Sequence, residues 1–199
     1  MNRDGSRTMR CLSMTDDSRF VRDVTYTVRS DERPHDVFVR LQVGEALVGT
    51  GYFVLRGREL EIVTDTHESG RTSQRLTVGP RIHIVTHAVM LDAWPWWSYD
   101  RDIGGEQALA IYNTSTRWNG TDGPLGRLET LRVRRHDDER ITVPAGTFHC
   151  RHLSFDSDVI RSPTSHVWFT GADAILVRYD WEGLDLEYVL TEADNVERA

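Results

Sequence analysis

Short runs of β-branched and aromatic residues recur along this chain from Phe20 onward, and Gly, Pro, Asp or Asn separates each run from the next. Few windows show the periodicity of an amphipathic helix, so the pattern predicts strands joined by hairpins. We expect about thirteen of them, at 20–28, 37–43, 47–55, 60–66, 71–78, 81–86, 107–114, 128–134, 139–143, 147–155, 165–169, 175–181 and 184–191. Open twisted sheets rarely exceed about ten strands. The sequence therefore predicts an all-β fold: a single curled antiparallel sheet forming a half-barrel or open barrel around a central ligand cavity.

The chain has 199 residues, which is long enough for one well-buried core. We predict a polar, disordered leader at 1–19 and one domain at 20–199. The leader lacks the apolar run of about seven residues found in secretory signals, and no run approaches the about 18 residues of a spanning helix. The two cysteines, Cys11 and Cys150, make no disulfide framework. We expect a cytoplasmic protein with no membrane partner.

The charge pattern excludes several classes of function. A net charge of −7 argues against a nucleic-acid partner, which would need clustered positive charge. All 24 basic residues are arginine, which excludes a lysine Schiff base and a lysine-anchored pyridoxal cofactor. The chain has no dinucleotide fingerprint, phosphate loop, serine nucleophile elbow or Cys-rich metal motif. We therefore expect no cofactor.

One segment concentrates the aromatic side chains. Residues 92–100 read DAWPWWSYD, which places three of the six tryptophans and one of the six tyrosines within six positions. Pro95 makes this segment unsuited to a regular helix or a central strand. Its rings suit the wall or lid of a hydrophobic pocket, and the alternative is that they plug one end of a core.

The C-terminal third carries a resemblance to a known group of proteins. The stretch 141–155, ITVPAGTFHCRHLSF, is followed by apolar runs at 167–169, 174–179 and 184–190. This order resembles bacterial domains of unknown function related to the lipoprotein-carrier (LolA/LolB) fold, which also includes the cofactor-free rearrangement enzyme of violacein biosynthesis. The resemblance implies a curled antiparallel half-barrel with a hydrophobic inner face. Because this chain lacks an export signal, the enzyme branch fits better than the carrier branch, although none of that enzyme's catalytic residues can be matched here.

Two histidines lie just before the aromatic segment. Alternation along a strand at 82–87 would place His83 and His87 on one face. A histidine near its reference pKa of about 6.5 can act as general acid or base, and the alternative is a pair of ordinary strand histidines. With Asp100, His83, His87 and His166 could in principle assemble a zinc or iron site. No motif of the His-Glu-x-x-His type supports this, and we expect no metal.

Other candidates are assigned by residue type. Phenols or a guanidinium could stabilise an oxyanion, and aromatic rings could stack on a substrate. An ordinary cross-strand ion pair is the alternative for Arg178 and Glu187. The predicted catalytic residues are His83, His87, Tyr99, Asp100, Tyr112 and Arg178, and the predicted substrate-binding residues are Trp94, Trp96, Trp97, Trp168, Tyr179 and His152.

These residues together predict a cofactor-independent enzyme. It would act on a hydrophobic, aromatic small molecule by acid/base catalysis, in a lyase, isomerase or rearrangement step such as C–C cleavage by deformylation. The alternative is a non-catalytic intracellular carrier for a lipid or aromatic ligand, with a cavity lined almost wholly by apolar side chains. A third reading makes the aromatic segment the interface of a homodimer.

Overall fold

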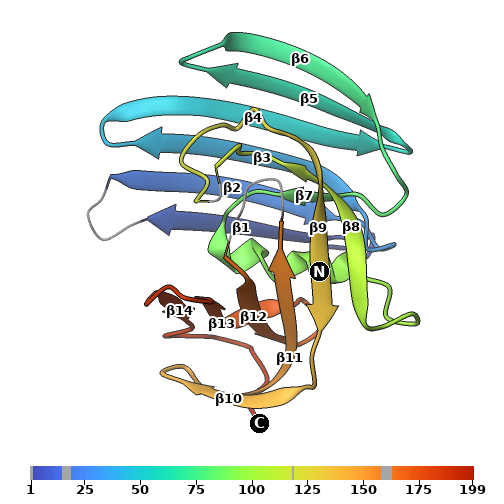
Figure 1. Ribbon diagram of the computed structural model, residues 1–199, viewed down its shortest axis with the longest axis vertical. Coiled ribbons are helices and arrows are strands. Elements are labelled where there is room, and N and C mark those ends of the chain that lie inside the picture. Colours follow the sequence, from blue (N-terminus) through green and yellow to red (C-terminus); the bar gives the residue numbers. More distant parts are fainter. Residues whose placement is uncertain (1, 15–18, 118, 158–162) are drawn as a thin grey trace. The chain divides into compact units, whose positions relative to one another are not determined.

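The computed structural model of the chain describes residues 2–14, 19–117, 119–157 and 163–199 (Figure 1). Strands make up nearly all of its regular structure, and the helical residues lie in two short 3-10 helices. The predicted all-β fold with a strongly curled sheet is confirmed, and the central ligand cavity stays a prediction. No helix among the described residues combines the length and the apolar character needed to cross a membrane.

The chain forms two compact units, of which the first comprises 1–88 with 110–129 and the second comprises 89–109 with 130–199. The first unit contains a six-stranded antiparallel sheet in which each strand pairs with the next along the chain. Its strands are β1 (Arg7–Met14), β2 (Phe20–Val28), β3 (Pro34–Val43), β4 (Ala46–Arg56), β5 (Glu59–Thr66) and β6 (Gly70–Thr77). Gly44 and Gly57 lie in the turns between these strands with positive φ, a conformation that glycine adopts without a steric penalty.

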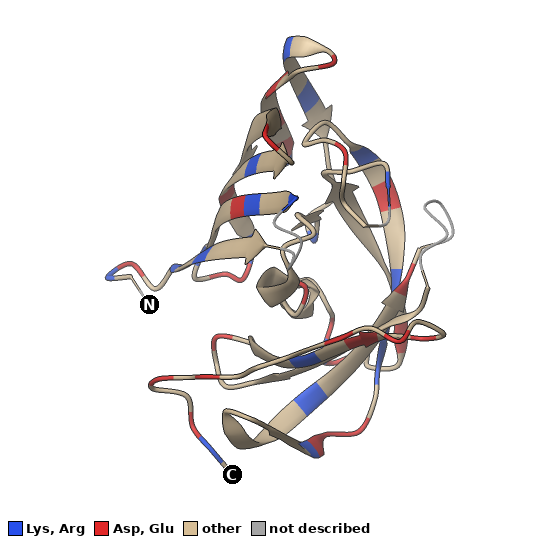
Figure 2. Cartoon of the chain, turned by 90° about the vertical axis from the view of Figure 1, so that its left-hand side faces the viewer, with Lys and Arg blue, Asp and Glu red and all other residues tan. Residues whose placement is uncertain are grey.

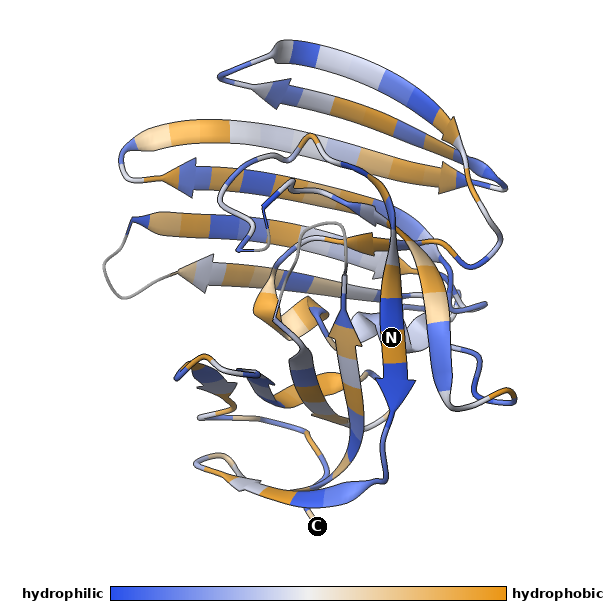
Figure 3. Ribbon diagram, viewed as in Figure 1, coloured by the Kyte–Doolittle hydropathy of each residue, from blue (hydrophilic) through white to orange (hydrophobic). Residues whose placement is uncertain are grey.

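Burial alternates along these strands as a half-buried sheet requires. Val24, Tyr26 and Val28 on β2 are buried, and the residues between them are half-exposed. Figure 3 shows this pattern as alternating hydrophobic and hydrophilic segments along the strands. Figure 2 shows acidic and basic residues interspersed along the strands. One face of the first sheet therefore supplies the apolar core of the first unit.

Strand β1 lies inside the segment for which the sequence predicts a disordered leader, so that expectation is corrected for Arg7–Met14. Every residue of β1 pairs with β2, from Arg7 opposite Val28 to Met14 opposite Val21. The Arg10 guanidinium also forms an ion pair with Asp23, at 2.7 Å. Of its eight residues only Cys11 is buried, so the strand has too little apolar alternation to be recognised from the sequence. Residues 1 and 15–18 of the leader lie outside the described residues.

The second sheet has the strand order β14-β13-β12-β11-β9-β8-β7, and β10 pairs with β11 beside this path. Strand β7 pairs with β8 in parallel, and the other pairings given for this sheet are antiparallel. Strands β8 and β9 contribute residues to both units. Its strands are β7 (His83–Val85), β8 (Glu106–Asn113), β9 (Arg127–Arg135), β10 (Glu139–Val143), β11 (Gly146–Asp156), β12 (Ser165–Thr170), β13 (Ile175–Trp181) and β14 (Glu187–Val189).

Strand β11 has buried side chains on both of its faces. Leu153 is buried on one face, whereas Phe148 and Cys150 are buried on the other. The second face belongs to an apolar cluster that also contains Trp168 and Val177. Leu190, Ala193 and Val196 of the C-terminal segment pack against this cluster. Phe148 and Cys150 alternate with the exposed His149 and the half-exposed Arg151, and this difference between the two faces specifies the register of β11.

The second unit contains two single-turn helices, η1 (Val89–Leu91), which precedes the aromatic segment, and η2 (Trp94–Trp97), which lies within it. Pro95 occupies the first turn of η2, where a missing N–H leaves no intrahelical hydrogen bond unmade. Trp94, Trp96 and Trp97 are all buried. The segment is thus part of the packed interior of the second unit.

Gly126 offers a test of packing in the first unit. A Cβ at this position would lie 1.7 Å from the carbonyl oxygen of Asn113, a backbone atom that cannot rotate away. We expect Gly126→Ala to lower the free energy of unfolding by about 2–3 kcal/mol, as for other overpacked sites. Urea denaturation measures the change.

Gly79→Ala is the matched control, because a Cβ at Gly79 would meet no atom within 4 Å. Its free energy of unfolding should stay within about 0.5 kcal/mol of wild type. Equal stability of the two variants would contradict the close approach at Gly126.

Candidate functional site

His83 is fully buried on β7, and its partner is a tyrosine. The His83 Nδ1 atom lies 3.3 Å from the hydroxyl of Tyr26, and the two rings stack with centroids 5.6 Å apart. The same hydroxyl accepts a hydrogen bond from the backbone N–H of Ile84. Burial lowers the pKa of His83 to about 3 and raises that of Tyr26. At neutral pH this buried imidazole is uncharged, and it forms a hydrogen bond with the hydroxyl of Tyr26.

His87 does not share a strand face with His83, because β7 ends at Val85. The φ angle of His87 is 56°, in the left-handed region, so the alternation of a strand cannot continue through it. Its Nε2 atom lies 2.6 Å from Oδ1 of Asn113. Its carbonyl oxygen accepts a hydrogen bond from the buried guanidinium of Arg22 at 2.6 Å. These contacts fix a turn of the chain.

The predicted oxyanion-stabilising groups make structural contacts. Tyr99 is buried and donates its hydroxyl to the carbonyl of Gly105 at 2.7 Å. Tyr112 is also buried, and its hydroxyl accepts the backbone N–H of Gly126 at 3.1 Å. Burial raises the pKa of both phenols. The Asp100 carboxylate accepts the N–H of Asp102 at 3.1 Å and so shapes the turn after the aromatic segment.

Arg178 and Tyr179 lie on β13 and point to opposite faces of the sheet. Arg178 forms ion pairs with Asp180 at 3.0 Å and Glu187 at 3.3 Å, so the cross-strand ion pair considered for it is present. Tyr179 is buried, and its hydroxyl donates to Oγ of Ser165 at 3.0 Å. Its pKa is raised by burial.

A hollow of about 450 Å³ lies at the ends of β4 and β5 in the first unit. It is lined by Ala46, Leu47, Gly49, Thr50, Asp65, Thr66 and His67. None of the predicted site residues belongs to this lining.

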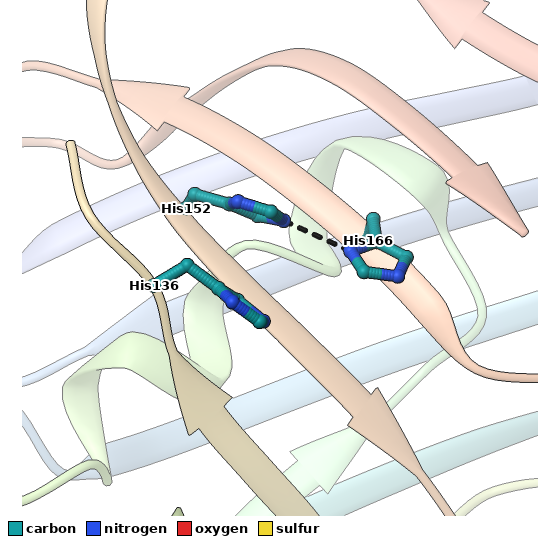
Figure 4. A group of neighbouring side chains, drawn as sticks. All are labelled: His136, His152 and His166. Carbon is teal, nitrogen blue, oxygen red and sulfur yellow. Dashed lines mark hydrogen bonds between the residues drawn. The ribbon is translucent and has the colours of Figure 1, made fainter. Parts of the chain in front are cut away.

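Three histidines converge on one face of the second sheet: His136, His152 and His166 (Figure 4). His152 lies on β11, His166 lies on β12, and His136 follows the last residue of β9. The antiparallel register places His152 opposite Trp168 and Ser154 opposite His166. One ligand nitrogen from each ring lies within 4.8 Å of the other two. All three residues belong to the second unit.

Two carboxylates flank this cluster, which we call the histidine cluster. Glu139 Oε1 lies 2.9 Å from Nδ1 of His152 and accepts the indole N–H of Trp168 at 3.1 Å. Glu182 Oε1 lies 3.1 Å from Nε2 of His166. Between the two rings, Nε2 of His152 and Nδ1 of His166 are 2.9 Å apart. The four side chains thus form one chain of contacts, Glu139–His152–His166–Glu182.

The remaining contacts of the cluster hold its rings in place. His136 Nε2 lies 2.8 Å from Oγ of Ser154. The His152 ring stacks between neighbours, with centroids 4.2 Å from His136 and 4.3 Å from Trp168. Burial, together with repulsion from His136 and His166, lowers the pKa of His152 to about 4, while Glu139 opposes the shift. Burial also lowers the pKa of His136.

The two carboxylates impose a particular arrangement of protons. If each outer nitrogen donates its proton to a carboxylate, then Nε2 of His152 and Nδ1 of His166 both present lone pairs. Two lone pairs 2.9 Å apart repel each other unless a cation is shared between them. That cation can be a proton or a metal ion. This is the chemically distinctive feature of the site.

Sequence reasoning named His152 and His166 separately and missed their grouping with His136, Glu139 and Glu182. The segment 149–152 reads HCRH, but strand alternation sends His149 to the opposite face from His152. The register of β11 with β12 is the missing information. An available signal was the carboxylate of Glu139, which lies in a hairpin with β11, opposite Cys150.

Comparisons with known proteins show the fold. No protein-family model matches the chain, and no curated protein matches it. A β-barrel-like protein of domain of unknown function DUF1849 from Brucella abortus matches 88% of this chain and 75% of its own, with a TM-score of 0.51 and 10% identity. A DUF1089 family protein from Pseudomonas aeruginosa matches 92% of this chain and 87% of its own, with a TM-score of 0.45 and 10% identity.

The likeness to the Brucella protein shows that this chain has a β-barrel-like fold. It agrees with the resemblance to bacterial domains of unknown function at the level of the fold. The finer resemblance, to the LolA/LolB fold and the violacein enzyme, stays a prediction.

The buried His83 makes stability depend on pH. Its folded pKa of about 3 lies below the ordinary value of 6.5, so the unfolded state binds more protons between these values. The contribution of His83 to the free energy of unfolding is therefore fully present above pH 6.5 and decreases as the pH falls toward 3. We expect His83 alone to reduce the free energy of unfolding by about 1.4 kcal/mol per pH unit between about pH 6 and 4.

The measurement compares urea unfolding of wild type and His83→Gln across this range. The variant should show a shallower pH dependence, whatever its stability at neutral pH. Parallel curves would show that His83 is not held neutral in the folded state.

Proposed function

We propose that this protein binds one divalent transition-metal ion through His136, His152 and His166. The observation that carries the proposal is the 2.9 Å contact between two imidazole nitrogens whose opposite nitrogens each face a carboxylate. This departs from the absence of metal expected from the sequence, which rested on motif spacing. The three ligands come from segments that are far apart in the sequence and meet in the sheet. They therefore form no short sequence motif.

The carboxylates behind two of the histidines support the proposal. Metal-ligating histidines almost always donate their other ring N–H to a carboxylate, carbonyl or water, which fixes the tautomer and ring orientation. Glu139 is placed to accept this proton from His152, and Glu182 is placed to accept it from His166. Glu139 is itself oriented by the indole N–H of Trp168. The inner nitrogens of His152 and His166 thus already face each other.

The donor set suits zinc, copper, iron or nickel, which imidazole ligands favour. Two nitrogens on a tetrahedral zinc ion lie about 3.3 Å apart, given Zn–N bonds of about 2.0–2.1 Å. The His152 and His166 nitrogens are near this separation already. One ligand nitrogen of His136 lies within 4.8 Å of the other two, so metal binding would require this ring to shift from its contacts with Ser154 and His152.

Three protein ligands leave a coordination position for water or substrate, as in catalytic zinc sites. A metal bound there would supply Lewis-acid activation of that ligand. The chain's own residues would orient the site: Glu139 and Glu182 hold the imidazoles, and Trp168 covers His152 with its ring. The substrate proposed from the sequence is a hydrophobic, aromatic small molecule.

Metal titration tests the proposal. Equilibrium dialysis with Zn²⁺ should give one ion per chain, and Co²⁺ should develop visible absorption bands of a histidine-ligated centre. We expect His152→Ala and His136→Ala to weaken Zn²⁺ binding by at least about 100-fold, and Glu139→Gln to weaken it by about 10–100-fold.

His149→Ala is the matched control, because His149 is exposed and neighbours the cluster in sequence but lies on the other face of β11. It should bind Zn²⁺ as wild type does. His136 is half-buried, so its variant tests the site even where His152→Ala disturbs packing. Unchanged Zn²⁺ binding in folded His136→Ala would refute the proposal.

A cofactor-free enzyme is the second candidate, and the hydrogen-bonded chain from Glu139 to Glu182 favours it. Here a proton instead of a metal ion would lie between His152 and His166. Both terminal carboxylates are substantially exposed, so protons can enter or leave at either end. Such a relay could serve the acid/base lyase or isomerase step predicted from the sequence.

The relay predicts a measurable shared proton. In chelator-treated protein, NMR should show a strongly downfield imidazole N–H resonance that disappears in His166→Gln and persists in His149→Ala. One equivalent of Zn²⁺ should then abolish this resonance if the metal proposal holds. A resonance that survives in the presence of bound Zn²⁺ would support the relay and place the metal elsewhere.

A further inference from the structure

Three arginines surround the ring of Trp96 on the face of the second sheet opposite the histidine cluster. The guanidinium carbons of Arg101, Arg135 and Arg151 lie 5.5, 5.8 and 5.2 Å from the ring centroid. All belong to the second unit, and they come from three different segments: the turn after η2, the end of β9, and β11. Arg101 and Arg135 are exposed, Arg151 is half-exposed, and Trp96 beneath them is buried.

The three positively charged guanidiniums lie close to one another around a single ring. A ring has two faces, so at least two of the three guanidiniums lie over the same face of Trp96. The negative face of an indole attracts a cation, but it does not remove the repulsion between neighbouring cations. In a chain with a net charge of −7, such convergence is unlike the mixture of signs elsewhere on the strands (Figure 2).

Several contacts hold this arrangement in place. Arg135 forms an ion pair with Asp138 at 3.1 Å, and Arg151 donates to the carbonyl of Gly171 at 3.1 Å. The Trp96 ring stacks on Tyr99 with centroids 5.9 Å apart and contacts Phe169 at 5.5 Å. The three guanidiniums thus contact the ring of Trp96, which packs against Tyr99 and Phe169.

The loop that carries Arg101 is likewise tied down. The carboxylate of Asp100 accepts the N–H of Asp102, and Gln107 bonds to the backbone N–H and carbonyl of Asp100. The backbone N–H of Arg135 donates to the carbonyl of Gly105 at 3.3 Å, which connects this loop to the end of β9. The backbone segments that carry Arg101 and Arg135 are therefore connected by hydrogen bonds.

We propose that Arg101, Arg135 and Arg151 form a binding site for a phosphate-class oxyanion above Trp96. Guanidinium groups present forked N–H donors that match the oxygens of phosphate, and an anion among them would neutralise their mutual repulsion. A free phosphate ion and the phosphoryl group of a phosphomonoester present the same oxygens. The site is separate from the metal proposal, because it uses no residue of the histidine cluster.

Inorganic phosphate is the probe. Isothermal titration at constant ionic strength should show saturable binding to wild type, with one site per chain, and chloride at the same ionic strength should give none. Arg101→Gln and Arg151→Gln should each weaken phosphate binding at least tenfold. Phenyl phosphate in a parallel titration distinguishes a phosphomonoester site, by tighter binding, from a site for the free ion.

Arg134→Gln is the matched control, because Arg134 precedes Arg135 on β9 and points to the other face, where it pairs with Glu106. It should bind phosphate as wild type does. His166→Gln should also bind phosphate normally, so failure of the metal proposal would leave this one intact. Absence of saturable binding to wild type, or full binding by Arg101→Gln, would overturn it.

Discussion

The register of β11 with its neighbours is the constraint on which the proposed sites depend. Leu153 is buried on one face of this strand, and Phe148 and Cys150 are buried on the other. A slip of one residue would send Phe148 and Cys150 to the face that carries the exposed His149 and the half-exposed Arg151. Burial therefore holds His152 opposite Trp168 and Ser154 opposite His166. The packing of β11 in the core therefore sets the positions of the histidines in the cluster.

Placing an imidazole at the edge of this core has an electrostatic consequence. Burial disfavours the charged form of His152, and the nearby rings of His136 and His166 add repulsion. Glu139 opposes both effects, and it also satisfies the indole N–H of Trp168. Removing Glu139 would leave two buried donors without this acceptor. The carboxylate at the start of β10 therefore couples the hairpin, the apolar cluster and the histidine cluster.

Local pattern was enough to predict many strands. The predicted ranges 20–28, 139–143 and 175–181 are the observed β2, β10 and β13, because alternation and turn residues are local signals. Strand β1 escaped prediction because pairing with β2, and not burial, defines it. The expected strand at 81–86 is shorter in the structure, at His83–Val85, and His87 beyond it has a positive φ that the sequence does not reveal.

The candidate site was less accessible to sequence reasoning, and the reason is geometric. The aromatic segment is recognisable from its composition, but its tryptophans are buried. The histidine cluster has no compositional signal, because its members are separated by 16 and 14 positions along the chain. Residues that approach through strand pairing are identified only when the register is known, and here that register is fixed by side chains outside the site.

Adjacent positions on β11 show how one strand can serve two kinds of chemistry. Arg151 and His152 follow one another, so alternation sends a guanidinium to one face of the sheet and an imidazole to the other. Arg151 meets the ring of Trp96, whereas His152 meets that of Trp168. Each charged or titratable side chain thus lies against an indole, and the same packing that buries the indoles positions both groups. The packing of β11 therefore positions the arginine of one proposed site and the histidine of the other.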